Sequence, residues 1–281
     1  MRPGPVEEVQ RTMDATELFK AGQLTEALRA QTHVVRSHPA DASARRLLVL
    51  LLAFAGEYTR ASTAVEALEA QAGQADWTNV LLRSLLAAEQ MRESVLEREG
   101  TPLVGDSPPA HLRARLRALA AARQGDLEQL EKCLDEAAAS TPTLQGRLDD
   151  APLDALRDDD DLLGSVLEVF AGGRYLWLPL EQIRSLTLAA PASALDLLWA
   201  PAALETHDGV EAQVHVPALY AGSARQSDDA LRLGRSTTWT DVGRGIQRGA
   251  GQRMLRSALA GEAREWPLLE VRSLTCEPPS P

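Results

Sequence analysis

Two stretches near the start of the chain share one pattern and decide how the first half folds: AGQLTEA at residues 21–27 and AGEYTRA at residues 55–61. They lie 34 residues apart, which is the period of helix–turn–helix solenoid repeats. In each stretch the glycine allows a turn between antiparallel helices, and the final alanine lets the second helix approach its neighbour closely. Such repeats are more typical of proteins that bind other proteins than of enzymes acting on small molecules.

The apolar periodicity, the caps and the prolines predict five to seven helices in the first half. Pro39 ends the second helix, and Asp41 or Ser43 caps the third. A third turn of the same kind, at residues 124–127, precedes the last helix. The predicted helices span residues 12–21, 24–37, 44–55, 59–71 (ended by Gly73), 77–99 (as one or two helices), 110–123 and 127–139.

The second half has a different character. Residues 146–161 are polar and acidic, which predicts a linker. Two β-rich runs around Gly172-Gly173 predict a hairpin, and residues 183–189, 210–216 and 268–276 predict further strands. Because proline is excluded from central strands, we expect the prolines to fall between these runs: Pro179, Pro191, Pro201 and Pro217.

The predicted fold class is therefore α+β. A TPR-like α-solenoid over residues 1–145 is followed by a smaller β-rich domain, mixed but mainly antiparallel, over residues 146–281. A stack of only a few helical hairpins is marginally stable by itself. We therefore expect the second domain to dock on the first.

The net charge of −11 excludes some partner classes. An acidic chain repels phosphate backbones and anionic lipid, so we expect neither nucleic acid nor membrane as partner, and a basic protein segment fits better. The longest apolar run, residues 47–55, is shorter than the roughly 20 residues that span a bilayer. No signal peptide is visible, and Cys133 and Cys276 have no metal or redox spacing. We expect a cytoplasmic protein.

The acidic run Asp158–Asp161 has three interpretations. Its carboxylates suit a hard divalent cation, and a metal-dependent hydrolase built on Asp158–Asp161 is the alternative function. A solvated linker or helix cap is the favoured interpretation. The third is a docking site for a basic segment of a partner, which makes Asp160 and Asp161 candidate contact residues.

The remaining motifs indicate no chemistry. The glycine-rich stretch at residues 243–251 lacks the lysine of a P-loop and the spacing of a dinucleotide fingerprint, so we predict a flexible loop that closes against the sheet. Arg253 beyond it is interpreted as a structural ion-pair partner. The five histidines do not cluster, and no G-x-S-x-G elbow occurs. We therefore predict no catalytic residue, no metal ligand, no cofactor and no small-molecule substrate.

Five of the eleven aromatic residues of the chain lie within one stretch of the second half. Exposed aromatics would form a peptide-binding face, whereas buried ones would form the core of the β domain. Tyr175 and Trp177 share one face of a strand, and we favour the core for most of the set. The set is Tyr175, Trp177, Trp199, Tyr220 and Trp239.

Several of these residues also match a known family. The chain resembles the ImpE/TagJ accessory proteins of bacterial type VI secretion systems. The match is dense in the second half, although Leu162 and Ser165 stand where the family usually has arginine and proline. The matching segments include AGQL (21–24), LLGSVLE (162–168), GRYLWLP (173–179), DLLWAPA (196–202), PALYAGS (217–223) and LGRSTTW (233–239).

The resemblance implies an α-solenoid joined to a β-rich domain and no enzymatic activity. It also implies two partners in the bacterial cytoplasm: the small subunit of the contractile sheath, bound through a helix, and the AAA+ unfoldase that recycles the sheath. A purely structural subunit is a further alternative. The candidate partner-binding residues are Asp160, Asp161, Tyr175, Trp177, Trp199, Tyr220, Arg235 and Trp239.

Overall fold

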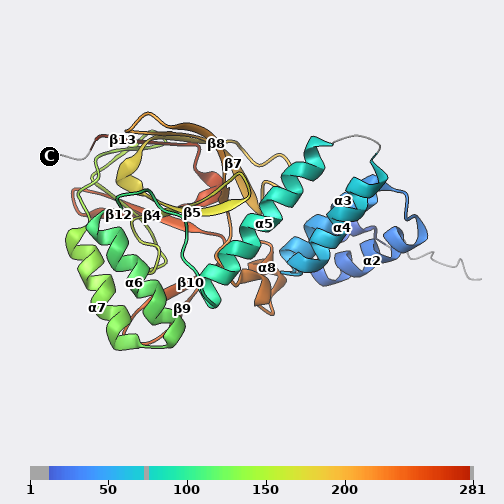
Figure 1. Cartoon of the computed structure of the whole chain (residues 1–281), viewed down its shortest axis with the longest axis horizontal. Helices are drawn as coiled ribbons and strands as arrows, with labels where there is room; N and C mark the ends of the chain where they lie inside the picture. Colours follow the sequence, from blue (N-terminus) through green and yellow to red (C-terminus); the bar gives the residue numbers. More distant parts are fainter. Residues whose placement is uncertain (1–12, 73–75, 279–281) are drawn as a thin grey trace, which may run out of the picture.

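The computed structural model describes residues 13–72 and 76–278. Its first half is helical, and the helices agree with the predicted ones to within a few residues (Figure 1). Residue 12 and Gly73 lie outside the described residues. The helices are α1 (Ala15–Lys20), α2 (Leu24–Ser37), α3 (Ala42–Phe54), α4 (Tyr58–Gln71), α5 (Trp77–Glu97), α6 (Ala110–Gln124) and α7 (Leu127–Ser140).

Local chemistry fixes where these helices begin. Of the two predicted caps of α3, Asp41 is the right one, because its carboxylate accepts a 2.9 Å hydrogen bond from the backbone N–H of Ala44. Residues 77–97 form one helix of 21 residues, capped by Asp76. Within residues 13–72 and 76–278, no helix is long and apolar enough to cross a membrane.

The helices form two groups (Figure 1). Consecutive helices from α1 to α5 pack against one another, as the repeat predicts, while α6 and α7 form a separate antiparallel hairpin. In Figure 1, α5 runs diagonally between the α2–α4 stack and the strands, and the α6–α7 hairpin lies below the strands. The third hairpin is thus separated from the first two by α5, which itself packs on the sheet.

The second half is built from antiparallel strand pairs. The eight-stranded sheet has the order β2-β1-β13-β6-β7-β8-β4-β5, beside the sheets β12-β11-β3 and β10-β9. The strands are β1 (Gly146–Leu148), β2 (Ala151–Leu153), β3 (Ala155–Asp158), β4 (Val166–Ala171), β5 (Arg174–Pro179), β6 (Ile183–Leu188), β7 (Trp199–Thr206), β8 (Glu211–Pro217), β9 (Thr237–Asp241), β10 (Gln247–Gly251), β11 (Met254–Leu259), β12 (Glu262–Pro267) and β13 (Ser273–Cys276).

Short helical turns connect some of these strands. The 3-10 turn η1 (Leu180–Gln182) follows β5, and η3 (Leu268–Glu270) precedes β13. Between β8 and β9 lie the 3-10 turn η2 (Ser223–Arg225) and the short helix α8 (Asp229–Arg232). In Figure 1, α8 lies between the helical stack and the strands, and it contacts α2.

Two predictions about segments of this half were wrong, and strands β7, β9, β11 and β12 were not predicted. The expected linker at residues 146–161 forms β1, β2 and β3, because its apolar residues pair into the sheets. The expected flexible loop at residues 243–251 is largely β10, which pairs with β9, and the turn between them packs on α7 rather than closing on the sheet. Strand β7, which carries Trp199, was not predicted at all.

The expectation that all four prolines lie between strands was wrong for three of them. Pro179 and Pro217 are the last residues of β5 and β8, and the larger departure is Pro201. It sits within the central strand β7, opposite His215 of β8. Its carbonyl faces the β6 side and accepts a hydrogen bond from the N–H of Ala189, just past the end of β6. Because N–H and C=O of one residue point to the same side of a strand, the missing N–H faces a position where β6 no longer pairs.

The β4–β5 hairpin lies between two hydrophobic cores. Its Phe170, Tyr175 and Trp177 pack with the helices, whereas Leu167 and Val169 pack with the rest of the eight-stranded sheet. The first five residues of β4 are therefore buried on both faces of the strand. The core that contains the helical residues therefore continues without interruption into the β-rich half.

The glycines of two repeat turns offer a matched test of this docking. Gly56 and Gly125 both have left-handed backbones, with φ of 72° and 70°. A Cβ on Gly56 would lie 2.9 Å from the Cβ of Ala224 in η2, whereas a Cβ on Gly125 would meet nothing within 4 Å.

We expect Gly125→Ala to lower the free energy of unfolding by about 1–2 kcal/mol, the cost of a left-handed alanine. Gly56→Ala should lower it by roughly 1–3 kcal/mol more, because the added methyl group also clashes across the interface. Urea denaturation at neutral pH measures both. Equal losses in the two variants would show that the α3–α4 turn does not dock on η2 as described.

Candidate functional site

A buried ion network joins the helices to the strands. Glu168 of β4 accepts hydrogen bonds from Arg92 of α5, at 2.8 Å from Nε and 2.7 Å from Nη2. On its other side Oε2 lies 3.3 Å from Nη1 of Arg253, which also contacts Asp158 at 2.6 Å through Nη2. These four residues, Arg92, Glu168, Arg253 and Asp158, are here called the ion network.

Aromatic side chains donate further hydrogen bonds around the network, in which Nη1 of Arg253 has no hydrogen-bond partner among the described residues. Tyr175 donates to Glu168, and Tyr220 donates to Asp158 at 2.9 Å. Trp199 donates through Nε1 to Glu89, which also pairs with Arg92. Buried charges are tolerated only when they are paired and hydrogen-bonded. The donors of these aromatic side chains therefore help to stabilise the buried carboxylates.

The pKa of Glu168 follows from this environment. Burial by itself would raise the pKa of the carboxyl, but the guanidinium groups of Arg92 and Arg253 and the hydrogen bonds from Arg92 and Tyr175 outweigh burial and lower it to about 2. Glu168 is therefore charged throughout the physiological pH range.

The acidic run Asp158–Asp161 is not a solvated linker, so the favoured interpretation was wrong. Its first three residues are buried, and Asp158 is fully so. Each carboxylate is paired within the chain, with the shortest contacts between 2.6 and 2.9 Å. The pairs are Asp158–Arg253, Asp159–Arg256, Asp160–Arg248 and Asp161–Arg157. The interpretation of Arg253 as a structural ion-pair partner is confirmed.

Backbone groups use the remaining oxygen atoms of this acidic turn. Asp160 accepts from the N–H of Leu162 at 3.0 Å and of Gly249 at 3.0 Å, and Asp161 accepts from the N–H of Gln247 at 2.7 Å. The carboxylates thus point to separate partners rather than to one centre. In the ranges 13–72 and 76–278, no group of three or more acidic, histidine or cysteine side chains could hold a metal ion. The geometry does not support a metal-dependent hydrolase.

Most of the predicted partner-binding residues are interior. Tyr175, Trp177, Trp199 and Tyr220 are each at most 3% exposed, so they cannot anchor a partner at the surface. Their burial agrees with the core interpretation, including the shared face of Tyr175 and Trp177. Asp160 is equally buried, and Asp161, partly buried, is held by Arg157.

The other two candidates lie nearer the surface. Trp239 is 37% exposed, and its ring meets that of Tyr220 edge to face at 5.5 Å between centroids. Arg235 is exposed but has an internal role, because its Nη2 donates to the carbonyls of Phe19 and Lys20 at 2.8 Å each and so satisfies the end of α1. The structure does not bring these eight residues together into one surface.

A serine–histidine–glutamate chain was missed by the sequence analysis. The ring of His111 lies 3.1 Å from Oγ of Ser165 through Nδ1 and 2.6 Å from Oε1 of Glu181 through Nε2. Ser165 is 4% exposed and also faces Arg115 and Thr141, each at 3.4 Å. A nucleophile needs access to its substrate, and Ser165 has none. These hydrogen bonds therefore link α6 to the start of β4 and to η1 rather than serving acyl transfer.

An open apolar cavity lies in the β-rich half. It has a volume of about 760 Å³ and lies between the β4–β5 hairpin, strands β7 and β8, and the segment at residues 103–107. Leu103 of that segment bridges to Leu176 of β5. The apolar lining includes Leu103, Val104, Val169, Leu176, Trp177, Leu178, Leu204, Val210, Ala212 and Val214. We call this the apolar cavity.

Polar groups are few in the apolar cavity. Asp106 and Asp208 are exposed and contribute carboxylates, and Glu181 contributes a third from inside. His207 also lines it, and its Nε2 is buried without a hydrogen-bond partner among the described residues. A concave apolar surface with a few acidic groups suits the apolar face of a helix that carries basic residues beside it.

Comparison with known proteins identifies the family. The model of a family described as ImpE protein matches residues 150–275. The chain is 35% identical over 270 residues to the type VI secretion system accessory component TagJ of Pseudomonas aeruginosa strain PAO1, across 95% of this chain and 92% of that protein. The chain belongs to the ImpE family.

A solved structure supports the fold of this ImpE family member. The crystal structure of protein VPA1032 from Vibrio parahaemolyticus superposes with a TM-score of 0.84 at 23% identity, and the match covers 94% of this chain and 97% of that one. The α+β architecture is therefore confirmed. The relative TagJ is named as an accessory component, which supports an accessory role for this ImpE family member.

The ion network and the apolar cavity were both missed by the sequence analysis, for different reasons. Glu168 did carry a signal, because a charged residue inside the apolar run SVLEVF must find a buried partner. The cavity carried none, because its lining residues are spread from Leu103 to Val214 and come together only in the folded sheet.

The lowered pKa of Glu168 predicts a pH-dependent stability. Because the folded-state pKa of about 2 lies below the ordinary value of 4.5, Glu168 stabilises the fold above pH 4.5, and this contribution is lost as the pH falls toward 2. We expect Glu168→Gln to lower the free energy of unfolding by about 3 kcal/mol at pH 7, with a difference from wild type that shrinks on acidification.

Urea denaturation of both proteins at several pH values measures this difference. Glu205→Gln is the control, because Glu205 pairs with Arg184 at the surface and should contribute little. A Glu168→Gln effect that stays constant between pH 7 and pH 3 would contradict the charged, paired state of Glu168.

Proposed function

We propose that this ImpE family member is a non-enzymatic adaptor of type VI secretion that binds a helix of the small sheath subunit in the apolar cavity. The observation that carries the proposal is the cavity itself, which is about 760 Å³ in volume, mainly apolar and open to solvent at Leu103 and Val210. These two side chains are 39% and 53% exposed. Exposed aliphatic residues at the mouth of an apolar hollow are typical of a protein interface.

The chemistry of the cavity favours an amphipathic helix over a small polar substrate. Apolar anchors spaced by one and two helical turns would fill the space between the β4–β5 hairpin and β8. Lysine or arginine beside those anchors would pair with Asp106 and Asp208 at the rim. Apolar burial would supply most of the affinity, and the rim charges would mainly raise the association rate.

We also propose the AAA+ unfoldase that recycles the sheath as a second partner. Its support is the family membership, since the relative TagJ is named an accessory component of type VI secretion. If both partners bind at once, the unfoldase should co-purify with this chain more strongly when the small sheath subunit is present. Loss of unfoldase recovery on adding the sheath subunit would contradict simultaneous binding.

The cavity assignment predicts the effect of two surface substitutions. Leu103→Asp together with Val210→Asp should weaken binding of the small sheath subunit at least tenfold, because apolar contacts worth about 1.5–3 kcal/mol each are replaced by charges. Isothermal titration with the purified sheath subunit measures the affinity. The pair Val242→Asp and Leu259→Asp is the control, because both residues are similarly exposed, at 39% and 45%, and neither lines the cavity.

A truncated sheath subunit without the helix completes the experiment. We expect it to bind neither wild type nor the control variant. Equal binding of the full and truncated subunits would contradict helix docking, and an unchanged affinity of the cavity variant would contradict the location.

A further inference from the structure

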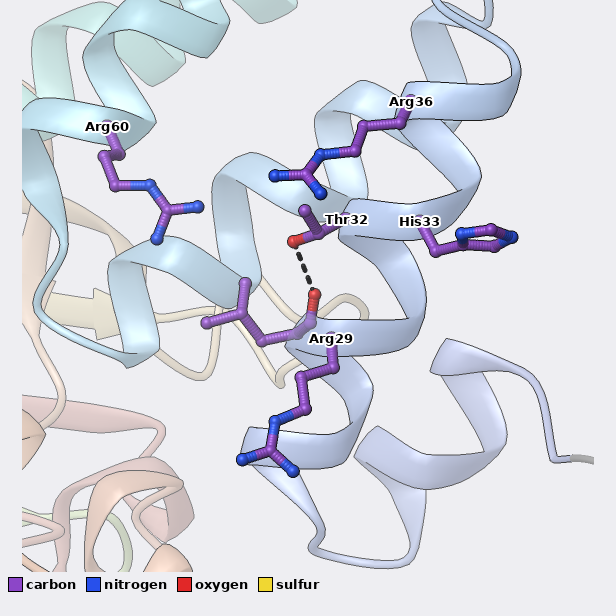
Figure 2. A pocket seen from close by; sticks show the side chains of 6 residues that line it. Arg29, Thr32, His33, Arg36 and Arg60 are labelled. Atoms are coloured by element: carbon purple, nitrogen blue, oxygen red, sulfur yellow. Dashed lines mark hydrogen bonds between the residues drawn. The ribbon is translucent and has the colours of Figure 1, made fainter.

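A second hollow lies on the helical stack, between α2 and the first turn of α4 (Figure 2). It has a volume of about 330 Å³ and a basic lining, although the whole chain has a net charge of −11. Its lining residues are Leu28, Arg29, Thr32, His33, Arg36 and Arg60. We call it the basic site.

Two of the three arginines of the basic site direct their charges into the space between α2 and α4. Figure 2 shows Arg36 on α2 and Arg60 on α4 pointing toward one another. The guanidinium of Arg29 lies nearer the start of α2, below the other two in this view. The ring of His33 points to the other side of α2. The hydroxyl of Thr32 donates to the carbonyl of Leu28 at 2.7 Å, so it is already used within the helix.

The positive charge of the basic site is largely uncompensated. In the described part of the chain, no carboxylate lies within ion-pair distance of Arg29 or Arg36, and Arg60 pairs only with Glu57 of its own turn. Elsewhere arginines of this acidic chain are commonly paired, including those of the ion network and the acidic turn. Guanidinium groups without an ion-pair partner among the described residues, as those of Arg29 and Arg36 are, favour an anionic ligand, and they bind carboxylate and phosphate with good geometry.

The spacing of the arginines distinguishes between such ligands. Arg29 and Arg36 are seven residues apart on one helix, which separates their backbones by about 10 Å along the axis. In Figure 2 the guanidinium groups of Arg29 and Arg36 point to different parts of the hollow, so in this arrangement they face two separate anionic groups, such as carboxylates along a peptide, rather than one phosphate. Leu28 adds an apolar contact between the charges, and the net charge of −11 disfavours a nucleic acid backbone.

We propose that the basic site binds an acidic segment of a partner protein, with carboxylates paired to Arg29, Arg36 and Arg60 and an aliphatic side chain against Leu28. This surface belongs to α2 and α4, whereas the apolar cavity belongs to β4, β5, β7, β8 and residues 103–107. The two interfaces share no lining residue. The proposal therefore stands or falls independently of the sheath-helix assignment.

Fluorescence anisotropy with a labelled peptide of alternating glutamate and leucine residues tests the proposal. The full-length protein should bind this probe at low ionic strength, and binding should weaken as salt screens the exposed charges. A probe with glutamine in place of glutamate should not bind. Arg36→Glu should weaken binding about tenfold, and Arg29→Glu with Arg36→Glu should abolish it.

Arg174→Glu is the matched control, because Arg174 is exposed on β5 and the described residues give it no ion pair. It changes the net charge as much as Arg36→Glu does, so it reports the effect of overall charge alone, and we expect a change of less than about threefold. Circular dichroism verifies that each variant keeps its helices. Arg29→Gln with Arg36→Gln repeats the test without charge reversal.

Three results would overturn the proposal. The first is equal probe binding by wild type and the Arg29/Arg36 variants. The second is an equal loss of binding in Arg174→Glu and Arg36→Glu, which would indicate long-range attraction without a site. The third is binding of single-stranded RNA or polyphosphate at this site by a protein that does not bind the acidic peptide.

Discussion

The charge of Glu168 constrains the whole molecule. It lies in a strand buried on both faces, and it is held between Arg92 of the helical half and Arg253 of the β-rich half. Because a buried carboxylate is tolerated only with such partners, α5 and the residue that precedes β11 must both reach β4 in the folded state. The docking of the two halves is thus fixed by ion pairing as well as by apolar packing.

The surrounding structure follows from that arrangement. Arg253 also pairs with Asp158, which places the acidic turn inside the molecule, where its remaining carboxylates pair with arginines of β3, β10 and β11. The aromatic residues Tyr175, Tyr220 and Trp199 donate further hydrogen bonds around the charges. The acidic tract and the aromatic cluster of the sequence therefore belong to one hydrogen-bonded arrangement in the interior.

The helices were predictable because their signals are local. Repeat turns at Gly22 and Gly56, the cap Asp41 and Pro39 all act within one or two helical turns. The acidic run was misread because its character depends on Arg248, Arg253 and Arg256, about 90 residues away in the sequence, which only the folded sheet brings near. β9 and β10 were missed because their glycines and polar residues hide the alternation of strands. Long-range pairing, rather than composition, decides those parts.

The pairing of Glu168 with two arginines from distant segments has an evolutionary consequence. A change at residue 92 or 253 leaves a charge of the opposite sign stranded in the interior, so it is tolerated only with a compensating change at residue 168 or 158. Among relatives of this protein these four positions should vary together or not at all, and neither half can be exchanged between relatives without the matching charges of the other.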